Sequence, residues 1–189
     1  MSVTALRRMA ATLGVLLIPA ATLLLASPAG ATTAACGNKP RCFGVLSNQA
    51  LPLEISTSVP VSQVQAGTTL TGMTPAFSAR GDWSVAIRGV DRKFRWAPNG
   101  VNSGLCITAS SDEVNSRPTL QQCVSGTAGS SHQLWHPVNV IGNGFRVYQN
   151  EANGLVLALR SDNSGTPLRL RPMSTGTGAS MNFVLNKPF

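Results

Sequence analysis

The chain has 189 residues and a formal net charge of +8, with 43% hydrophobic and only 12% charged residues. Lysine and glutamate each occur three times. Because two of the best helix-forming residues are nearly absent, a helical bundle is excluded. Serine, threonine, valine, glycine, asparagine and proline are abundant instead, which is typical of short strands joined by turns.

The first segment, residues 1–31, is predicted to be a secretory signal peptide. Two arginines near its start precede an apolar stretch from Met9 to Leu25, and Ala29-Gly30-Ala31 has the small-residue pattern of a cleavage site. Cleavage would leave residues 32–189, a size that suits a single domain, and would lower the net charge to +6. No later apolar run reaches the ~20 residues of a membrane helix, so we expect no span in the mature chain.

All four cysteines lie in the part expected to be exported, and export leads to an oxidising compartment. Four cysteines allow three connectivities, of which we favour the two local pairings, Cys36–Cys42 and Cys106–Cys123. The second would stabilise the fold by about 3 kcal/mol in the loop-entropy view. A zinc site is the alternative, but neither pair has the C-x2-C spacing. We therefore expect no metal and no cofactor.

Four short features recur three times in the same order, at intervals of 48 to 52 residues. Each belongs to a segment with apolar residues at alternate positions, the period of a half-buried strand, and turn-forming residues separate the segments. The first feature comprises Phe43-Gly44-Val45, Phe94-Arg95-Trp96 and Phe145-Arg146-Val147. The others are Leu53, Leu105 and Leu155 with the strands they begin, then Leu70, Leu120 and Leu170, then Trp83, Trp135 and Phe183. The pattern predicts about twelve strands in three units, near residues 43–90, 91–141 and 142–189.

Three open four-stranded units cannot each bury a core, so we expect them to share one around a pseudo-threefold axis. Its inward side chains would be the six recurring leucines, the set Trp83, Trp135 and Phe183, and the set Ile55, Ile107 and Leu157. Closing the strands around this core also removes exposed sheet edges. The prediction is an all-β fold, a β-trefoil with pseudo-threefold symmetry. A β-sandwich is the alternative, but it does not explain the recurrence.

The second unit resembles the ricin-type, or Q-x-W, β-trefoil lectin family. It carries Asn102-Ser103-Gly104-Leu105-Cys106-Ile107, then Pro118-Thr119-Leu120-Gln121-Gln122-Cys123, then Gln133-Leu134-Trp135, in the order of the family. The third unit matches more loosely and the first least, and the likeness extends from about Phe43 to Leu185. The resemblance implies an intra-repeat disulfide between Cys106 and Cys123 and non-catalytic carbohydrate binding.

Sugar sites of that family use an aspartate just after the second strand and an aromatic ring one residue past a leucine. The aspartate accepts hydrogen bonds from sugar hydroxyls, and the ring stacks on the apolar sugar face. Here the aspartate positions hold Ser56, Thr108 and Ala158, and the ring positions hold Thr71, Gln121 and Arg171. Of the polar signature only Gln133 remains, so the resemblance implies a carbohydrate-binding role for it, with bracing of the turn as the alternative.

Basic residues gather in two places. Arg88, Arg92, Lys93 and Arg95 lie near the junction of the first two units, and Arg160, Arg169 and Arg171 lie in the third. Arg169 and Arg171 alternate with leucines, so they should share the outer face of a strand. Guanidinium groups bind oxyanions with two hydrogen bonds, which predicts an anion-binding face formed by Arg160, Arg169 and Arg171. The alternative is that these arginines only keep a lysine-poor domain soluble.

Enzymatic chemistry is not indicated. His132 and His136 bracket a predicted strand, where they would lie ~13 Å apart, too far to share a metal. No nucleophile motif occurs, and Asp112-Glu113 lack the separation that glycosidases need. We expect no catalytic residues. We also expect no nucleic-acid partner, because the basic residues are not interleaved with exposed aromatic rings.

The sequence therefore favours a secreted, extracellular, monomeric module without catalysis, whose partner is an extracellular glycan, anionic or polymeric. The alternative is a secreted β-trefoil scaffold that binds protein, such as a hydrolase inhibitor, through the Thr57–Gln65 or Asp112–Pro118 loop. A third interpretation is a degenerate lectin with only a structural or surface role.

Overall fold

The computed structural model describes residues 42–45, 53–74, 79–125, 130–141, 145–161, 163–173 and 183–185. The predicted signal peptide and Cys36 lie outside these residues. Within them the chain forms twelve strands and four short 3-10 helices, and no helix there has the length and apolar character to cross a membrane. The elements are β1 (Phe43–Val45), β2 (Leu53–Thr57), η1 (Val61–Gln63), β3 (Leu70–Met73), η2 (Ala79–Gly81), β4 (Trp83–Arg88), β5 (Asp91–Trp96), η3 (Pro98–Gly100), β6 (Leu105–Thr108), β7 (Thr119–Gln122), η4 (Ser131–Gln133), β8 (Trp135–Ile141), β9 (Phe145–Asn150), β10 (Val156–Leu159), β11 (Thr166–Arg171) and β12 (Phe183–Leu185).

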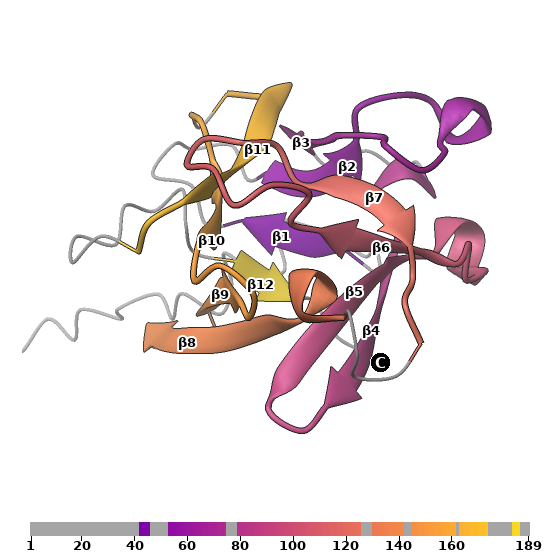
Figure 1. The fold of residues 1–189 in the computed structure, drawn as a ribbon. Coiled ribbons are helices and arrows are strands. Elements are labelled where there is room, and N and C mark those ends of the chain that lie inside the picture. Colours follow the sequence, from indigo (N-terminus) through magenta and orange to yellow (C-terminus); the bar gives the residue numbers. More distant parts are fainter. Residues whose placement is uncertain are drawn as a thin grey trace, which may run out of the picture.

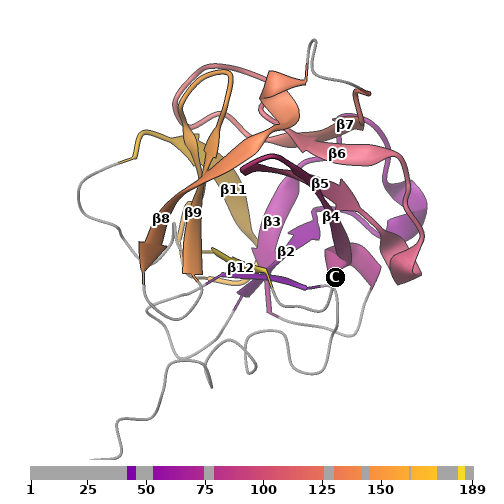
Figure 2. The ribbon, with the colours of Figure 1, turned by 90° about the horizontal axis from the view of Figure 1, so that it is seen from below.

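All twelve strands belong to one antiparallel sheet that curls on itself. Strands β1, β12, β9, β8, β5 and β4 pair in that order, and a bridge between Cys42 and Asp82 brings the two ends of the series together. The hairpins β2–β3, β6–β7 and β10–β11 lie on one side of this barrel, in the upper part of Figure 1. Figure 2 shows the pairs β8–β9, β4–β5 and β1–β12 around the interior. This is the predicted β-trefoil.

Each unit contributes one aromatic ring to the centre of the barrel. The rings of Phe43 and Phe94 stack with centroids 4.7 Å apart, and Tyr148 meets them edge-on at 5.8 and 4.9 Å. The alignment of Phe145 with Phe43 and Phe94 in the sequence repeat was wrong, because the pairing of Gln149 with Val156 puts Tyr148 in register with Phe94. The side chain of Phe145 lies outside those that the structure describes.

The recurring leucines are buried as expected, but one of them was aligned incorrectly. Leu120 pairs with Ile107 and Leu170 pairs with Leu157, whereas in the first unit Gly72, not Leu70, stands opposite Ile55. A shift of two residues leaves the same face inward, so Leu70 is still fully buried. Leu159 fills the space that a side chain at position 72 would occupy, because a Cβ on Gly72 would lie 2.8 Å from Leu159 Cδ1.

Backbone hydrogen bonds link each hairpin to the next one around the axis. Gly67 N–H donates to Leu120 O at 2.7 Å, Asn115 N–H to Leu170 O at 2.7 Å, and Gly165 N–H to Gly72 O at 2.8 Å. All three donors have positive φ, of 93°, 68° and 85°, a conformation that glycine and asparagine tolerate best. The three bonds therefore form a closed series that joins the units.

Indole hydrogen bonds repeat with the same symmetry. Trp83 Nε1 donates to Ile55 O at 2.8 Å and Trp135 Nε1 donates to Ile107 O at 3.2 Å. Both indoles are fully buried, as predicted, and each satisfies a carbonyl of its own unit's second strand. Phe183 has the equivalent place by strand register, opposite Val45, but its side chain lies outside the description.

The structure pairs Cys106 with Cys123, whose Cα atoms are 5.0 Å apart, as the sequence suggested. The bond joins the start of β6 to the residue after β7. Cys42 is also disulfide-bonded, while Cys36, its expected partner, lies outside the described residues. Cys42 Sγ lies 3.5 Å from Glu54 Oε2, a contact and not a hydrogen bond because a disulfide sulfur carries no proton.

We predict that Leu120→Ala lowers the free energy of unfolding by about 2–5 kcal/mol, because the side chain is fully buried and its removal leaves a cavity. Urea denaturation measures this change. The control is Val101→Ala at a side chain that is 69% exposed, which should change stability by less than about 0.5 kcal/mol. Similar values for the two variants would contradict the proposed core.

Burial raises the pKa of Tyr148, the single tyrosine of the chain, to about 12, although Arg92 and Arg146 act in the opposite direction. The folded state then holds the phenolic proton more tightly than the unfolded chain, so stability should fall as the pH rises from about 10 to about 12. The ultraviolet absorbance of the phenolate should report this midpoint directly. A midpoint near 10 in the folded protein would disprove burial, and Tyr148→Phe should remove this part of the alkaline destabilisation.

Candidate functional site

A pocket of about 430 Å³ opens beside the hairpin β6–β7 of the second unit. Its lining comes from the ends of both strands, from the residue after the disulfide and from η4. These parts are adjacent because β6 pairs with β7 and Ala109 N–H donates to His132 O at 2.9 Å. The lining residues are Thr108, Ala109, Ser110, Gln121, Gln122, Val124, His132 and Gln133.

Gln133 forms the floor of this pocket and is only 2% exposed. Its Nε2 donates to Thr108 Oγ1 at 3.1 Å and to Gln122 O at 2.8 Å, and its Oε1 accepts from Val124 N–H at 2.9 Å. Both amide hydrogens are therefore used within the protein. The geometry assigns Gln133 a positioning role, the bracing that the sequence had offered as its alternative, with little capacity left for a sugar.

A buried lysine holds the carbonyl group of Val124, the residue whose amide is bound by Gln133. Lys93 is 1% exposed and its Nζ donates to Val124 O at 2.8 Å, so Val124 is held by both its carbonyl and its amide. Burial, followed by the like charges of Arg88 and Arg95, lowers the pKa of Lys93. The sequence grouped this lysine with an exposed basic cluster, and only the packing of β5 shows its structural role.

The helix η4 is fixed by Asn150, another buried polar residue. Its Nδ2 donates to the carbonyls of Ser131, His132 and Leu134 at 3.0–3.2 Å. The expectation of a strand beginning at Gln133 was wrong by two residues, because these bonds turn the chain into a helix before β8. His132 is thereby placed at the pocket.

The two histidines do not share a site. His136 Nδ1 lies 3.0 Å from Asp91 Oδ1 in the β8–β5 contact, and His132 Nδ1 lies 3.9 Å from Asp112 Oδ1. Among the residues that the structure describes, no group of three His, Cys, Asp or Glu side chains could hold a metal ion.

The rim of the pocket carries neutral hydrogen-bonding groups. The hydroxyls of Ser110 and Thr119 are hydrogen-bonded, and Gln121 Nε2 donates to Thr119 Oγ1 at 3.0 Å. The exposed Gln122 side chain has no hydrogen bond within the described part of the chain. Amide and hydroxyl groups both donate and accept, so this rim suits a ligand rich in hydroxyls.

The corresponding place in the first unit is closed. Ser56 is 2% exposed and its hydroxyl donates to Glu54 Oε1 at 3.3 Å, so it cannot meet a ligand. The corrected register also moves the aromatic-ring position of this unit from Thr71 to Met73. Neither residue offers the carboxylate or the ring of a lectin site.

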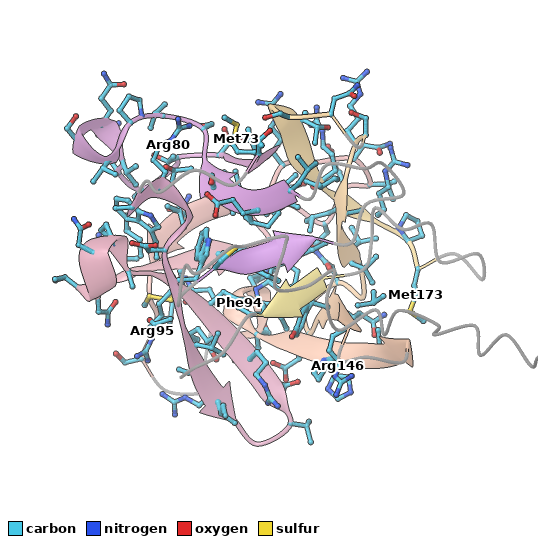
Figure 3. The ribbon with its side chains drawn as sticks, turned by 180° about the vertical axis from the view of Figure 1, so that it is seen from behind. Met73, Arg80, Phe94, Arg95, Arg146 and Met173 are labelled. Atoms are coloured by element: carbon cyan, nitrogen blue, oxygen red, sulfur yellow. A yellow bond between two sulfur atoms is a disulfide. The ribbon has the colours of Figure 1, made fainter. Side chains whose placement is uncertain are left out.

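The two basic clusters differ in the structure. Arg160, Arg169 and Arg171 line a second hollow, of about 410 Å³, together with Asn115. The other cluster does not form one face: Lys93 is buried, and Arg92 Nη1 donates to the carbonyls of its own hairpin at 2.8 and 3.1 Å. Figure 3 shows Phe94 in the interior, with Arg95, the next residue of β5, directed outward.

The two loops suggested for protein binding also differ. The Asp112–Pro118 loop is bonded to β11 through Asn115 and Ser116, and Asn153 Nδ2 donates to Asp112 Oδ1 at 3.2 Å. Most of the Thr57–Gln65 loop is exposed, including the η1 helix at its centre. The Thr57–Gln65 loop makes no such hydrogen bond to another unit within the described structure, and Val64 anchors it to the core.

No protein-family model and no curated protein sequence matches the chain. Solved structures do: the designed 3-fold symmetric protein ThreeFoil aligns with a TM-score of 0.62 at 14% identity, over 77% of this chain and 99% of that protein. An exo-β-1,3-galactanase from Clostridium thermocellum aligns at 0.63 and 16% identity, over 80% of this chain and 31% of the enzyme. The Polyporus squamosus lectin bound to a human-type influenza-binding epitope aligns at 0.52 and 12% identity, over 78% of this chain and 49% of the lectin. At these identities the likeness shows the β-trefoil fold, and function must be argued from the site.

We predict that Gln133→Ala lowers the free energy of unfolding by about 1–3 kcal/mol, because Val124 N–H and Gln122 O lose their buried partner. Hydrogen exchange of the Val124 amide should become faster in the same variant. Gln63→Ala, which removes an exposed glutamine in η1, is the matched control and should leave both measurements unchanged. Equal behaviour of the two variants would remove the bracing role.

Proposed function

We propose that this chain is a secreted ricin-type carbohydrate-binding module without catalytic activity, and that the second-unit pocket is its glycan site. The observation that carries the proposal is the pocket itself. It includes Thr108 and Gln121, the positions at which the resemblance implies a sugar site, and its rim carries neutral groups that can hydrogen-bond to hydroxyls. β-Trefoil neighbours that include a lectin bound to a glycan epitope support the assignment of class.

The chemistry of the lining supports binding of sugar hydroxyls. Gln121, Gln122 and Ser110 together offer donors and acceptors, and the disulfide and Gln133 hold the backbone beneath them in place. A preorganised polar site avoids part of the ordering cost of binding. The lining also includes the exposed Val124 and the ring of His132, which provide an apolar surface for the carbon face of a sugar.

The missing aspartate and aromatic ring determine which glycan suits the pocket. Thr108 and Gln121 stand in their places, and neutral hydrogen bonds contribute about 1 kcal/mol each. A single monosaccharide would therefore bind weakly. An extended or polymeric glycan that continues beyond the pocket fits better, because it adds contacts along the surface.

Absence of catalysis is part of the proposal. The described residues that line the pocket include no aspartate or glutamate, and hydrolysis of a glycoside needs two carboxylates at a controlled separation. Binding without turnover is the activity that these side chains support.

The test is binding of the oxidised protein to a panel of neutral and acidic glycans, measured at low and high salt. We predict saturable binding of a neutral glycan that free sugar displaces and that salt leaves largely unchanged. Gln122→Ala should weaken this binding about tenfold, the effect of 1.4 kcal/mol. Gln63→Ala removes the same group outside the pocket and should have no effect.

Failure of every neutral glycan to bind would contradict the proposal. The second candidate function, inhibition of a hydrolase, would then gain support, since the exposed Thr57–Gln65 loop is available to a protein partner. A stoichiometric loss of protease activity, together with protection of this loop from cleavage, would establish that function instead.

A further inference from the structure

The outer face of β11 carries two half-buried arginines over a hollow of about 410 Å³. Leu168 and Leu170 are fully buried and alternate with Arg169 and Arg171, so both guanidinium groups project on the outer side of the strand. Arg160, just after β10, reaches the same hollow. The expectation that these three residues share a face is therefore consistent with the packing.

The hollow is built by two units, because a loop of the second unit closes it. Asn115 N–H donates to Leu170 O at 2.7 Å, and Leu170 N–H donates to Ser116 O at 3.0 Å. Arg169 Nη1 then donates to Asn115 O at 2.9 Å. These bonds fix one wall and orient one guanidinium before any ligand arrives, so part of the ordering cost of binding is already met.

The charge of the hollow is not compensated within the described residues. The exposed Arg117 of the Asp112–Pro118 loop adds a fourth positive charge near Arg169. Within the described residues none of these four arginines lies within 4.0 Å of a carboxylate, and the Nε of Arg171 is buried without a hydrogen-bond partner. Burial, followed by the charges of the other three, lowers the pKa of Arg169. Guanidinium groups that repel one another in this way are stabilised by an added anion.

The same positions in the second unit show that the fold does not need these charges. By strand register, Arg160, Arg169 and Arg171 correspond to Ser110, Thr119 and Gln121. That trio is neutral and joined by hydrogen bonds. Since neutral side chains support the same hairpin there, the arginines supply something that the architecture does not require.

We propose that the Arg160–Arg169–Arg171 hollow binds the oxyanion groups of an acidic polysaccharide, sulfate esters or carboxylates, at a site separate from the neutral pocket. The inference rests on the proposed function only in taking the ligand to be a glycan. Planar guanidinium forks hold either oxyanion with paired hydrogen bonds. Nucleic acid is disfavoured because the Trp, Phe and Tyr side chains that the structure describes are all buried and offer no stacking surface.

The test compares three polymers with one backbone: dextran, carboxymethyl dextran and dextran sulfate. The full chain, oxidised, should bind one or both charged polymers saturably and should not bind dextran at this hollow. Arg169→Gln with Arg171→Gln should weaken the binding at least tenfold. Arg160→Gln, at an exposed side chain without a hydrogen bond in the described structure, is a second variant with little risk to folding, and melting temperatures check that each protein is folded.

The matched control is Arg88→Gln with Arg92→Gln, which removes two charges from the β4–β5 hairpin. Unchanged binding in this control supports the site, whereas equal losses in both double variants would show diffuse attraction and overturn it. No binding to either charged dextran, or binding only to anionic lipid vesicles, would also overturn it. The vesicles are included because the exposed Val114 and Met173 lie next to this region in the sequence, and Figure 3 shows Met173 at the periphery.

The outcome is independent of the neutral pocket. The Arg169→Gln, Arg171→Gln variant should keep neutral-glycan binding, and Gln122→Ala should keep binding to charged dextran. Loss of the neutral site alone would refute the proposed function and leave the anion site intact. Absence of binding to charged dextran alone would refute the anion site and leave the proposed function intact.

Discussion

The structure depends on one constraint: no hairpin of this chain can bury its apolar face by itself. Leu53, Leu105 and Leu155 and their neighbours are covered only because the three units meet around one axis. The series of backbone bonds from Gly67, Asn115 and Gly165 joins each hairpin to the next, so no unit is independent of the others. Exposed sheet edges are reduced at the same time, since the barrel strands pair around the interior.

The same constraint leaves the outward positions of the hairpins free to differ. In β3, β7 and β11 inward side chains alternate with outward ones, so chemistry can change on the outside while the core stays apolar. The three units use this freedom differently. The first is closed by Ser56 and Glu54, the second has a neutral pocket, and the third has an arginine-lined hollow. Three related places on one scaffold thus have three different chemistries.

Buried polar side chains provide the precision of the second-unit pocket. Gln133, Lys93 and Asn150 each make hydrogen bonds to backbone carbonyls, and together they fix Val124 and η4. Buried polar groups are stable only when they are satisfied, which ties the shape of the pocket to the integrity of the core. The residues that define the pocket's shape are therefore different from those at its rim, such as Gln122, that can meet a ligand.

Much of the fold could be predicted from the amino-acid sequence, because strand alternation and a repeat near 50 residues are visible in the order of the residues alone. They indicated the β-trefoil, the buried leucines and tryptophans and the outward arginines of β11. The Cys106–Cys123 pairing was expected on other grounds, from the preference for local pairings and from the family resemblance. Register was different: a period of two cannot detect a slip of two residues, so Gly72 and not Leu70 aligns with Leu120. The roles of Tyr148, Gln133, Lys93 and Asn115 likewise depend on partners in distant strands or in another unit. Long-range pairing decides which backbone group each side chain meets, and for that reason only the tertiary structure could distinguish the bracing residues of the pocket from the exposed residues at its rim.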